Sequence, residues 1–152
     1  RMTGNELVKL RQETVSFIFQ DSNLLPDLNA LDNVAQPLRH QGVMPGPARA
    51  KAMELLEKLA MGDRWMGMPE QLSGGEQQRV CIARAIVKNP ELILADEPTG
   101  NLDPTAAHKI LRILEQINKE GTTVVMATHN YKLISDRDYR IIELKEGSLV
   151  SS

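Results

Sequence analysis

The chain has 152 residues, of which 41% are hydrophobic and 25% are charged, close to the averages for globular proteins. This composition excludes an intrinsically disordered chain, a collagen-like repeat and a coiled-coil rod, and no apolar run is long enough to span a bilayer. Lys and Arg number 18 against 20 Asp and Glu, a net charge of −2, so we do not expect a nucleic-acid-binding face.

The first half of the chain begins with a predicted strand and continues with helices. The β-branched and aromatic segment 14–19 is typical of a buried strand, and it ends at Gln20. A polar, turn-rich stretch follows, and the segment 62–71 is predicted to be a second loop. Apolar spacing and the positions of Gly and Pro predict three helices, over 31–41, 47–60 and 74–89.

The second half of the chain alternates between strands and helices. It predicts a buried strand over 92–95, a helix over 104–119, a strand over 123–128 and a terminal hairpin over 140–145 and 148–151. This order is typical of an α/β fold with a mostly parallel sheet. The segment 31–71 holds helices and no strand, so we interpret it as a helical lobe inserted into the α/β core.

The start of the helix over 74–89 has the features of a phosphate-binding turn. Ser73 and Glu76 form an S-x-x-E capping box, in which each side chain bonds a backbone amide at the helix start. Gly74 and Gly75 lie between them, although each glycine costs about 1 kcal/mol relative to Ala in a helix. Glycine allows another molecule to approach the backbone, and the helix dipole favours an anion there. The alternative is an ordinary cap with flexible glycines.

Two adjacent carboxylates, Asp96 and Glu97, follow the strand 92–95. A buried parallel strand delivers such residues to its carboxyl end, where the sites of α/β proteins form. Asp96 could hold Mg²⁺, which prefers oxygen ligands, and Glu97 could act as a general base toward water. The alternative is a solvated acidic strand end.

Three further residues each have a structural explanation when taken alone. Asp103 precedes Pro104 and is explained as the N-cap of the following helix. His129 comes just after a predicted strand, where a structural histidine is common, and Gln20 also ends a strand.

Taken together, these residues resemble the ATP-binding domain of ABC transporters. The motifs that match the family, in its order, are Gln20 (Q-loop), 72–78 (signature), 92–96 (Walker B), Glu97 (catalytic glutamate), 101–103 (D-loop) and His129 (switch histidine). The segment 97–103 is similar to the branch of lipoprotein-release, macrolide-export and cell-division (FtsE-type) ATPases. The segments 71–79 and 126–131 favour the cell-division type.

The resemblance implies ATP and Mg²⁺ as cofactors, with a role for each matching residue. It implies catalytic roles for Glu97 and His129, Mg²⁺ contacts for Asp96 and Gln20, and nucleotide contacts for Gln20, Ser73, Gly74, Gly75 and Asp103. It also implies a head-to-tail dimer with a second ATP-binding subunit and an integral membrane permease of FtsX-like or related type. The implied location is cytoplasmic, on the inner face of the membrane, which agrees with the single cysteine, Cys81.

One motif of the family is absent from the sequence. None of the ten glycines is followed by Lys, so there is no G-x-x-x-x-G-K-[ST] phosphate loop. We interpret 1–152 as a partial, N-terminally incomplete P-loop NTPase-like domain, with 1–20 and 90–152 in the core and 21–89 in the Q-loop and helical subdomain. We expect such a chain to be inactive alone, and its terminal hairpin to dock weakly, to rearrange or to pair between chains.

Two other functions are compatible with parts of the pattern. The first is a non-catalytic interaction module that offers its signature helix to a partner. The second is a DNA-maintenance ATPase head of the SMC or Rad50 kind, which shares the signature and Walker B motifs. Those heads carry long heptad arms, whereas only residues 21–72 separate Gln20 from Ser73, and breakers interrupt their helices.

Overall fold

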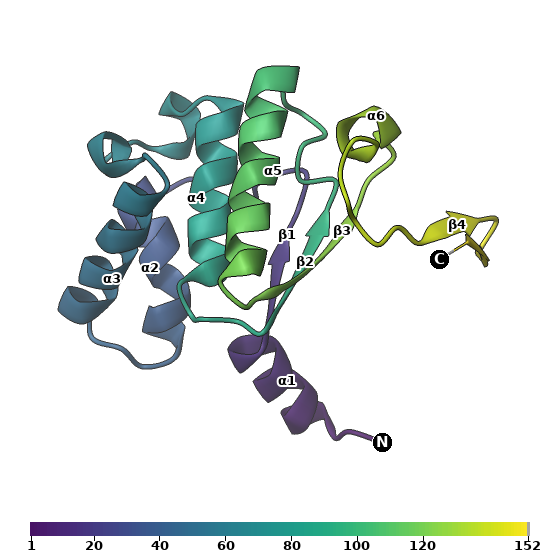
Figure 1. The fold of residues 1–152 in the computed structure, drawn as a ribbon. Coiled ribbons are helices and arrows are strands. Elements are labelled where there is room, and N and C mark those ends of the chain that lie inside the picture. The colour runs from purple at the N-terminus through teal and green to yellow at the C-terminus, as the bar shows by residue number, and fades with distance from the viewer. Residues whose placement is uncertain (152) are drawn as a thin grey trace.

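The computed structural model describes residues 1–151 and contains a three-stranded parallel sheet (Figure 1). The strands are β1 (Val15–Ile18), β2 (Leu92–Asp96) and β3 (Thr123–Ala127), in the order β1-β2-β3. Ile18 is in register with Ala95, and Ala95 with Met126, so the three carboxyl ends meet at one edge. The predicted α/β class with a parallel sheet is confirmed.

Four helices form layers on one face of this sheet. They are α2 (Ala30–His40), α3 (Pro45–Lys58), α4 (Gly74–Ile86) and α5 (Pro104–Lys119). Helices α4 and α5 lie against the strands, while α2 and α3 pack together on the outer side of α4 (Figure 1). All four were predicted, with ends that differ from the structure by three residues or fewer.

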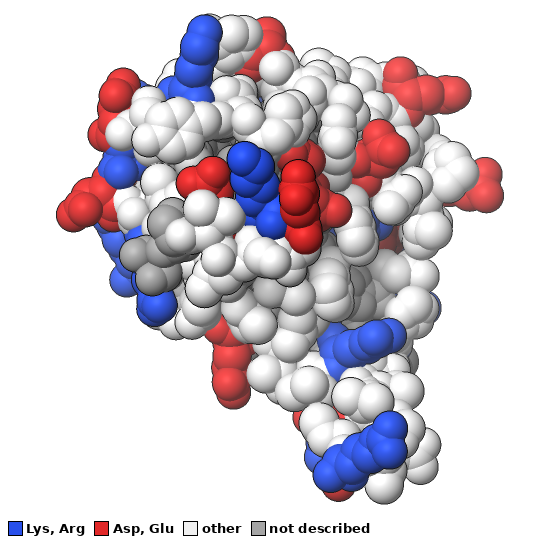
Figure 2. Space-filling view, turned by 90° about the vertical axis from the view of Figure 1, so that its right-hand side faces the viewer, with Lys and Arg blue, Asp and Glu red and all other residues white. Residues whose placement is uncertain are grey.

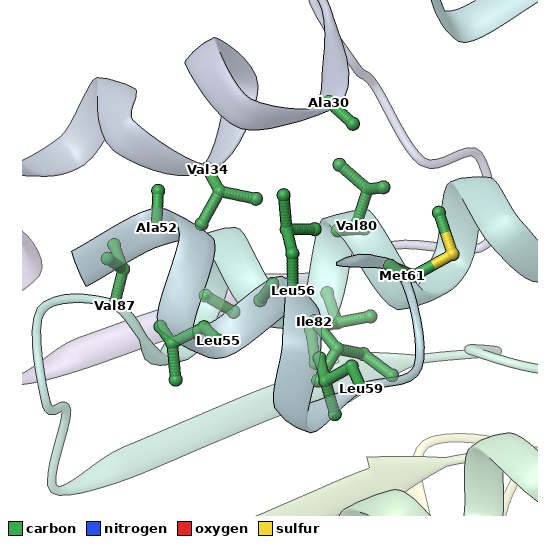
Figure 3. Packing of buried hydrophobic residues seen from close by; sticks show 14 of the residues in the cluster. Ala30, Val34, Ala52, Leu55, Leu56, Leu59, Met61, Val80, Ile82 and Val87 are labelled. Carbon is green, nitrogen blue, oxygen red and sulfur yellow. The ribbon is translucent and has the colours of Figure 1, made fainter. Parts of the chain in front are cut away.

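The main core lies where α2, α3 and α4 meet. Figure 3 shows their apolar side chains converging between the helices, among them Val34, Leu56 and Val80, which are fully buried. Ala48, Ala52, Leu55 and Leu56 on α3, and Leu59 directly after it, recur at helical spacing and are all buried. Burial of each leucine side chain stabilises the folded state by about 1.5–3 kcal/mol relative to leaving it exposed to water. This packing fixes the helical lobe against the helix that begins at Ser73.

The other face of the sheet carries no helix in the described part of the chain. Alternation along the strands turns Ile18 and Ile93 toward α4 and α5, where both are fully buried. Phe17, Phe19 and Val125 point the opposite way and are 42%, 43% and 54% exposed. The rings of Phe17 and Phe19 stack with their centroids 6.0 Å apart.

Helix α1 (Gly4–Glu13) was not predicted from the sequence. It projects away from the sheet (Figure 1) and buries none of its residues. Its sequence signal is a capping box, in which Thr3 Oγ1 accepts from the Glu6 amide and the Glu6 carboxylate accepts from the Thr3 amide. No helix within residues 1–151 has both the length and the apolar character needed to cross a membrane.

Short elements complete the described chain. The predicted loop 62–71 contains two 3₁₀ turns, η1 (Gly62–Arg64) and η2 (Pro69–Gln71), and helix α6 (Tyr131–Ile134) follows β3. The terminal hairpin consists of β4 (Glu143–Lys145) and β5 (Ser148–Ser151), which form a separate two-stranded sheet. Its first strand is shorter than predicted, and the hairpin is not hydrogen-bonded to β3, in agreement with the weak docking expected. Figure 2 views this side and shows acidic and basic residues interspersed rather than gathered into a basic field.

A small second cluster holds the segment before the hairpin against α5. Leu133 and Ile134 pack on Ala107 and Leu111. Arg137 and the Tyr139 hydroxyl both donate to the Glu115 carboxylate on α5. The C-terminal segment is therefore attached at Tyr139, and the residues beyond it extend away (Figure 1).

The attachment predicts an unusual titration of Tyr139. Burial raises its pKa to about 12, and the hydrogen bond to Glu115 adds to the rise. The stabilisation is therefore present below the unfolded tyrosine pKa of about 10 and is lost as the pH rises toward 12. In the Tyr131→Phe chain, where Tyr139 is the only tyrosine, we expect phenolate absorbance to appear near pH 12, and at lower pH after Glu115→Gln. An ordinary tyrosine titration, with circular dichroism still native, would contradict the contact.

Candidate nucleotide-binding and catalytic site

The parallel register brings four of the predicted site residues to one edge of the sheet. Gln20 follows β1, Asp96 ends β2 with Glu97 directly after it, and His129 follows β3. Because the strands are parallel and adjacent, these side chains belong to one carboxyl edge. The sequence pattern placed each of them after a strand, and the strand order makes them neighbours.

Glu97 and His129 are in direct contact. Glu97 Oε1 accepts from the His129 backbone amide at 2.8 Å and lies 2.6 Å from His129 Nδ1, while Oε2 accepts from Thr128 Oγ1 at 3.3 Å. The Glu97 side chain is 20% exposed and that of His129 is 85% exposed. One end of the imidazole is therefore fixed by the carboxylate, and the rest of the ring faces solvent.

The backbone of Glu97 lies in the left-handed region, with φ = 47°. For a residue other than glycine this conformation costs roughly 1–2 kcal/mol. Two hydrogen bonds hold it: the Glu97 amide donates to the Ala127 carbonyl at 2.9 Å, and the Gly100 amide donates to the Glu97 carbonyl at 3.0 Å. This turn directs the carboxylate toward His129 rather than along the strand.

Opposing effects set the pKa of Glu97. Burial alone would raise it, but the hydrogen bonds from His129 and Thr128 outweigh burial, and the pKa lies below its usual value. The carboxylate is therefore ionised at neutral pH, which is the state that a base or a water-orienting group needs.

Asp96 is exposed at the end of β2, and no side-chain partner is recorded for it among residues 1–151. No group of three or more His, Cys, Asp or Glu residues in this part of the chain could form a metal cage. A single carboxylate with free oxygens fits Mg²⁺, which usually takes one or two protein carboxylates and completes its shell with phosphate and water.

Ser73 begins α4 as its N-cap. Its hydroxyl accepts from the Glu76 amide at 3.2 Å, and Glu76 Oε2 accepts from the Ser73 amide at 2.8 Å, so the predicted capping box is confirmed. A Cβ on Gly74 would lie 3.4 Å from Leu102, and one on Gly75 would lie 3.5 Å from Ala106. Both distances are ordinary contacts, so packing within the chain does not require glycine at either position.

Gln20 lies against the loop that precedes α5. Its Nε2 donates to Asn101 Oδ1 at 2.9 Å, and Asn101 Nδ2 donates to Asp21 Oδ1 at 3.3 Å. A Cβ on Gly100 would approach the end of the Gln20 side chain to 2.8 Å, so a larger residue here would displace that side chain from its present position. A cleft of about 280 Å³, lined by Gln20, Gly74 and Asn101 among others, separates this loop from the start of α4.

Asp103 caps α5, accepting from the Ala106 amide at 3.0 Å. This contact is the structural explanation that the sequence offered for it. Leu102 lies beside Gly74, so Asp103 is next to the residue that contacts the start of α4.

Three polar residues to which sequence analysis gave no individual role connect these segments, although Gln78 and Asn101 lie within the signature and D-loop segments. Buried Gln78 donates to the Phe19 carbonyl at 3.2 Å and to the Pro98 carbonyl at 2.8 Å. Buried Asn33 bonds both the amide and the carbonyl of Leu25. Asn101 holds Gln20, as described above. For Asn33 the signal in the sequence was a polar side chain among the apolar residues of a helix, whereas Gln78 stands in a polar run and carries no such signal.

The parallel sheet, the helices on its face and the residues at its carboxyl edge define a P-loop NTPase fold. The sequence profile of the family described as ABC transporter matches residues 2–100. A profile described as AAA domain, putative AbiEii toxin, Type IV TA system, matches 68–135, less than half of the chain. The chain belongs to the ABC transporter family, and the sequence resemblance is confirmed.

Several curated relatives are similar over nearly the whole chain. Identity is 47% to a macrolide export ATP-binding/permease protein, MacB, of Aggregatibacter actinomycetemcomitans, over 99% of the chain and 23% of that protein. It is 44% to the lipoprotein-releasing system ATP-binding protein LolD of Hyphomonas neptunium, over 99% of the chain and 66% of LolD. It is 46% to the cell division ATP-binding protein FtsE of Escherichia coli K12, over 97% of the chain and 69% of FtsE.

A solved structure supports the same fold. The ATP-binding cassette MJ0796, described as a dimer in a post-hydrolysis state bound to ADP and Pi, superposes with a TM-score of 0.82 at 42% identity. The match covers 97% of this chain and 66% of the MJ0796 chain. The chain thus spans about a quarter of the length of MacB and about two thirds of the length of the other proteins named.

The contact between Glu97 and His129 predicts a shift in titration. The low pKa of Glu97 stabilises the fold above the unfolded pKa of the carboxyl, and this contribution is lost as the pH falls through the folded value. In His129→Ala we expect the Glu97 pKa to rise toward its unfolded value, so the stability lost on going from neutral to acid pH becomes smaller. The pKa is measured by ¹³C NMR of the carboxyl carbon. Thr128→Val, which removes the longer hydrogen bond, should have a smaller effect. An unchanged Glu97 pKa in His129→Ala would disprove the coupling.

Proposed function

We propose that this chain is part of an ABC-type ATPase subunit that couples ATP binding and hydrolysis to a membrane permease. The proposal rests on one observation. At the carboxyl edge of the sheet, Glu97 is ionised and bound by His129, and the exposed carboxylate of Asp96 lies directly before it in the chain. Family membership supplies the nucleotide chemistry to which this arrangement is suited.

In this proposal, Asp96 and Gln20 hold Mg²⁺ at the carboxyl edge of β2 and β1. Bound Mg²⁺ would neutralise charge on the ATP phosphates. Glu97 orients the attacking water and accepts its proton. His129 keeps the Glu97 carboxylate in place and turns its exposed ring toward the γ-phosphate, so the chain contributes mainly positioning and charge stabilisation.

We propose that Ser73, Gly74 and Gly75 face the γ-phosphate held by a second ATP-binding subunit in a head-to-tail dimer, and that Asp103 contacts nucleotide across the same interface. Two observations support this arrangement. The helix amides at Ser73 form an anion-favouring terminus. The two glycines are not required by packing within the chain, which leaves space for an approaching phosphate.

We further propose a division into a core, 1–20 and 90–152, and a Q-loop and helical subdomain, 21–89, that transmits closure to the permease on the cytoplasmic face of the membrane. Buried Asn33 fixes the segment after Gln20 by bonding Leu25 on both sides, while the Leu25 side chain is 40% exposed. In this proposal, the exposed Leu25 side chain on the fixed segment contacts the permease.

Within the family we propose the cell-division type, with an FtsX-like permease as partner. The identities to the MacB, LolD and FtsE relatives differ by only three percentage points. The proposal therefore depends on the segments 71–79 and 126–131. The assignment can be tested by co-purifying a full-length protein that carries these residues with permeases of each type. Selective capture of a permease other than the FtsX-like type would reject the assignment.

The 152 residues contain no phosphate loop, so we predict that alone they show no measurable ATP hydrolysis and very weak nucleotide binding. Without the loop's amides and lysine, few donors remain for the phosphates. Isothermal titration calorimetry with Mg-ATP measures the affinity directly. Micromolar binding by these residues would overturn the prediction, and hydrolysis restored by mixing with a P-loop-bearing partner would favour the alternative of an interaction module.

In a full-length protein that supplies the phosphate loop, we predict that Glu97→Gln abolishes ATP turnover and leaves ATP binding largely intact. The amide keeps the size of the side chain but cannot accept a proton from water, so loss of turnover by a factor of about 10²–10⁴ is expected. Steady-state phosphate release and equilibrium binding measure the two effects. Unchanged turnover would remove Glu97 from its proposed role.

A further inference from the structure

Arg64, at the end of η1, contacts the turn that begins α4 at two points. One guanidinium nitrogen, Nη2, donates to the Gln71 carbonyl at 2.9 Å, and Nε lies 3.3 Å from Glu76 Oε1. These two partners flank Ser73 in the sequence, on either side of the glycine-containing turn. Arg64 therefore contacts one residue on each side of the segment that carries Ser73, Gly74 and Gly75.

Glu76 places a negative charge inside this turn. Its second oxygen, Oε2, is bound by the Ser73 amide at 2.8 Å, and its side chain is only 22% exposed. The Ser73 hydrogen bond is the main cause that lowers its pKa, and Arg64 and Arg79 add to the effect, so Glu76 is ionised. A carboxylate beside amides that are proposed to meet a phosphate would repel that phosphate unless a cation compensates it.

Arg64 supplies this compensation at the shortest range that the structure records. Arg79, one turn further along α4, donates instead to the Leu59 carbonyl at 3.4 Å. We propose that Arg64 is a positioning residue that cancels the charge of Glu76, so that the capped turn presents its amides to the γ-phosphate without a net negative charge. The inference rests on the proposed role of Ser73, Gly74 and Gly75.

A purely mechanical role for Arg64 predicts something different. In that case Arg64 acts by fixing the Gln71 carbonyl, and removal of the Glu76 charge does not repair its loss. In the electrostatic role, removing both charges restores neutrality. Substitution of Arg64 alone, compared with substitution of Arg64 and Glu76 together, therefore separates the electrostatic role from the mechanical one.

The experiment uses a full-length protein carrying these residues, in the Glu97→Gln background so that bound ATP persists. The measured quantity is the Mg-ATP concentration that gives half-maximal dimer, determined by analytical ultracentrifugation. Arg64→Gln should raise this concentration about fivefold, the size expected for one partly exposed ion pair. The double variant Arg64→Gln, Glu76→Gln should return to within about twofold of the parent.

Lys51→Gln is the matched control, because Lys51 forms an exposed ion pair with Glu54, also 3.3 Å long, on α3 of the same helical lobe. It removes the same charge and should leave the ATP dependence unchanged. The defect of Arg64→Gln should also shrink as salt screens the repulsion, which a mechanical role would not predict.

The outcomes distinguish a failure of the charge-compensation role from a failure of the proposed dimer. If the double variant is as impaired as Arg64→Gln, or if Arg64→Gln has no effect, the charge-compensation role is wrong while the proposed dimer stands. If the parent protein with Glu97→Gln alone forms no ATP-dependent dimer, the proposed function is wrong, and the role inferred for Arg64 is wrong as well.

Discussion

The parallel pairing of β2 with both β1 and β3 is the constraint on which the site depends. Ile18, Ala95 and Met126 are in register, so the residues that follow them reach the same edge of the sheet. Buried Ile18 and Ile93 fix this register, because a slip of one residue would turn both toward the uncovered face. The position of Glu97 beside His129 is thus a consequence of packing beneath the sheet.

The geometry of Glu97 is held by backbone as much as by side chains. Glu97 adopts a left-handed conformation that the Ala127 carbonyl and the Gly100 amide stabilise. The next residue, Pro98, is fully buried and accepts through its carbonyl from Gln78. The strain at Glu97 is therefore offset by contacts from β3 and α4, and the direction of its carboxylate is set by the fold.

The regular elements could be predicted from the sequence because their causes are local. Apolar runs gave the strands, and the caps at Ser73 and Asp103 gave the starts of α4 and α5. Helix α1 has equally local causes, including the Thr3–Glu6 capping box, but its apolar residues Leu7, Val8 and Leu10 are few and none of them is buried. The Gln20–Asn101 hydrogen bond joins residues 81 apart, and no local pattern encodes such a pair.

The glycines show how structure adds to a motif. Sequence alone gives no reason to separate Gly100 from Gly74 and Gly75, since all three lie in motifs of the family. In the structure, a Cβ on Gly100 would come within 2.8 Å of the end of the Gln20 side chain, so Gln20 would have to move from its contact with Asn101. Gly74 and Gly75 have room for a Cβ at ordinary contact distance. Packing within the chain therefore does not explain glycine at these two positions, which is consistent with the proposal that a second subunit approaches this turn.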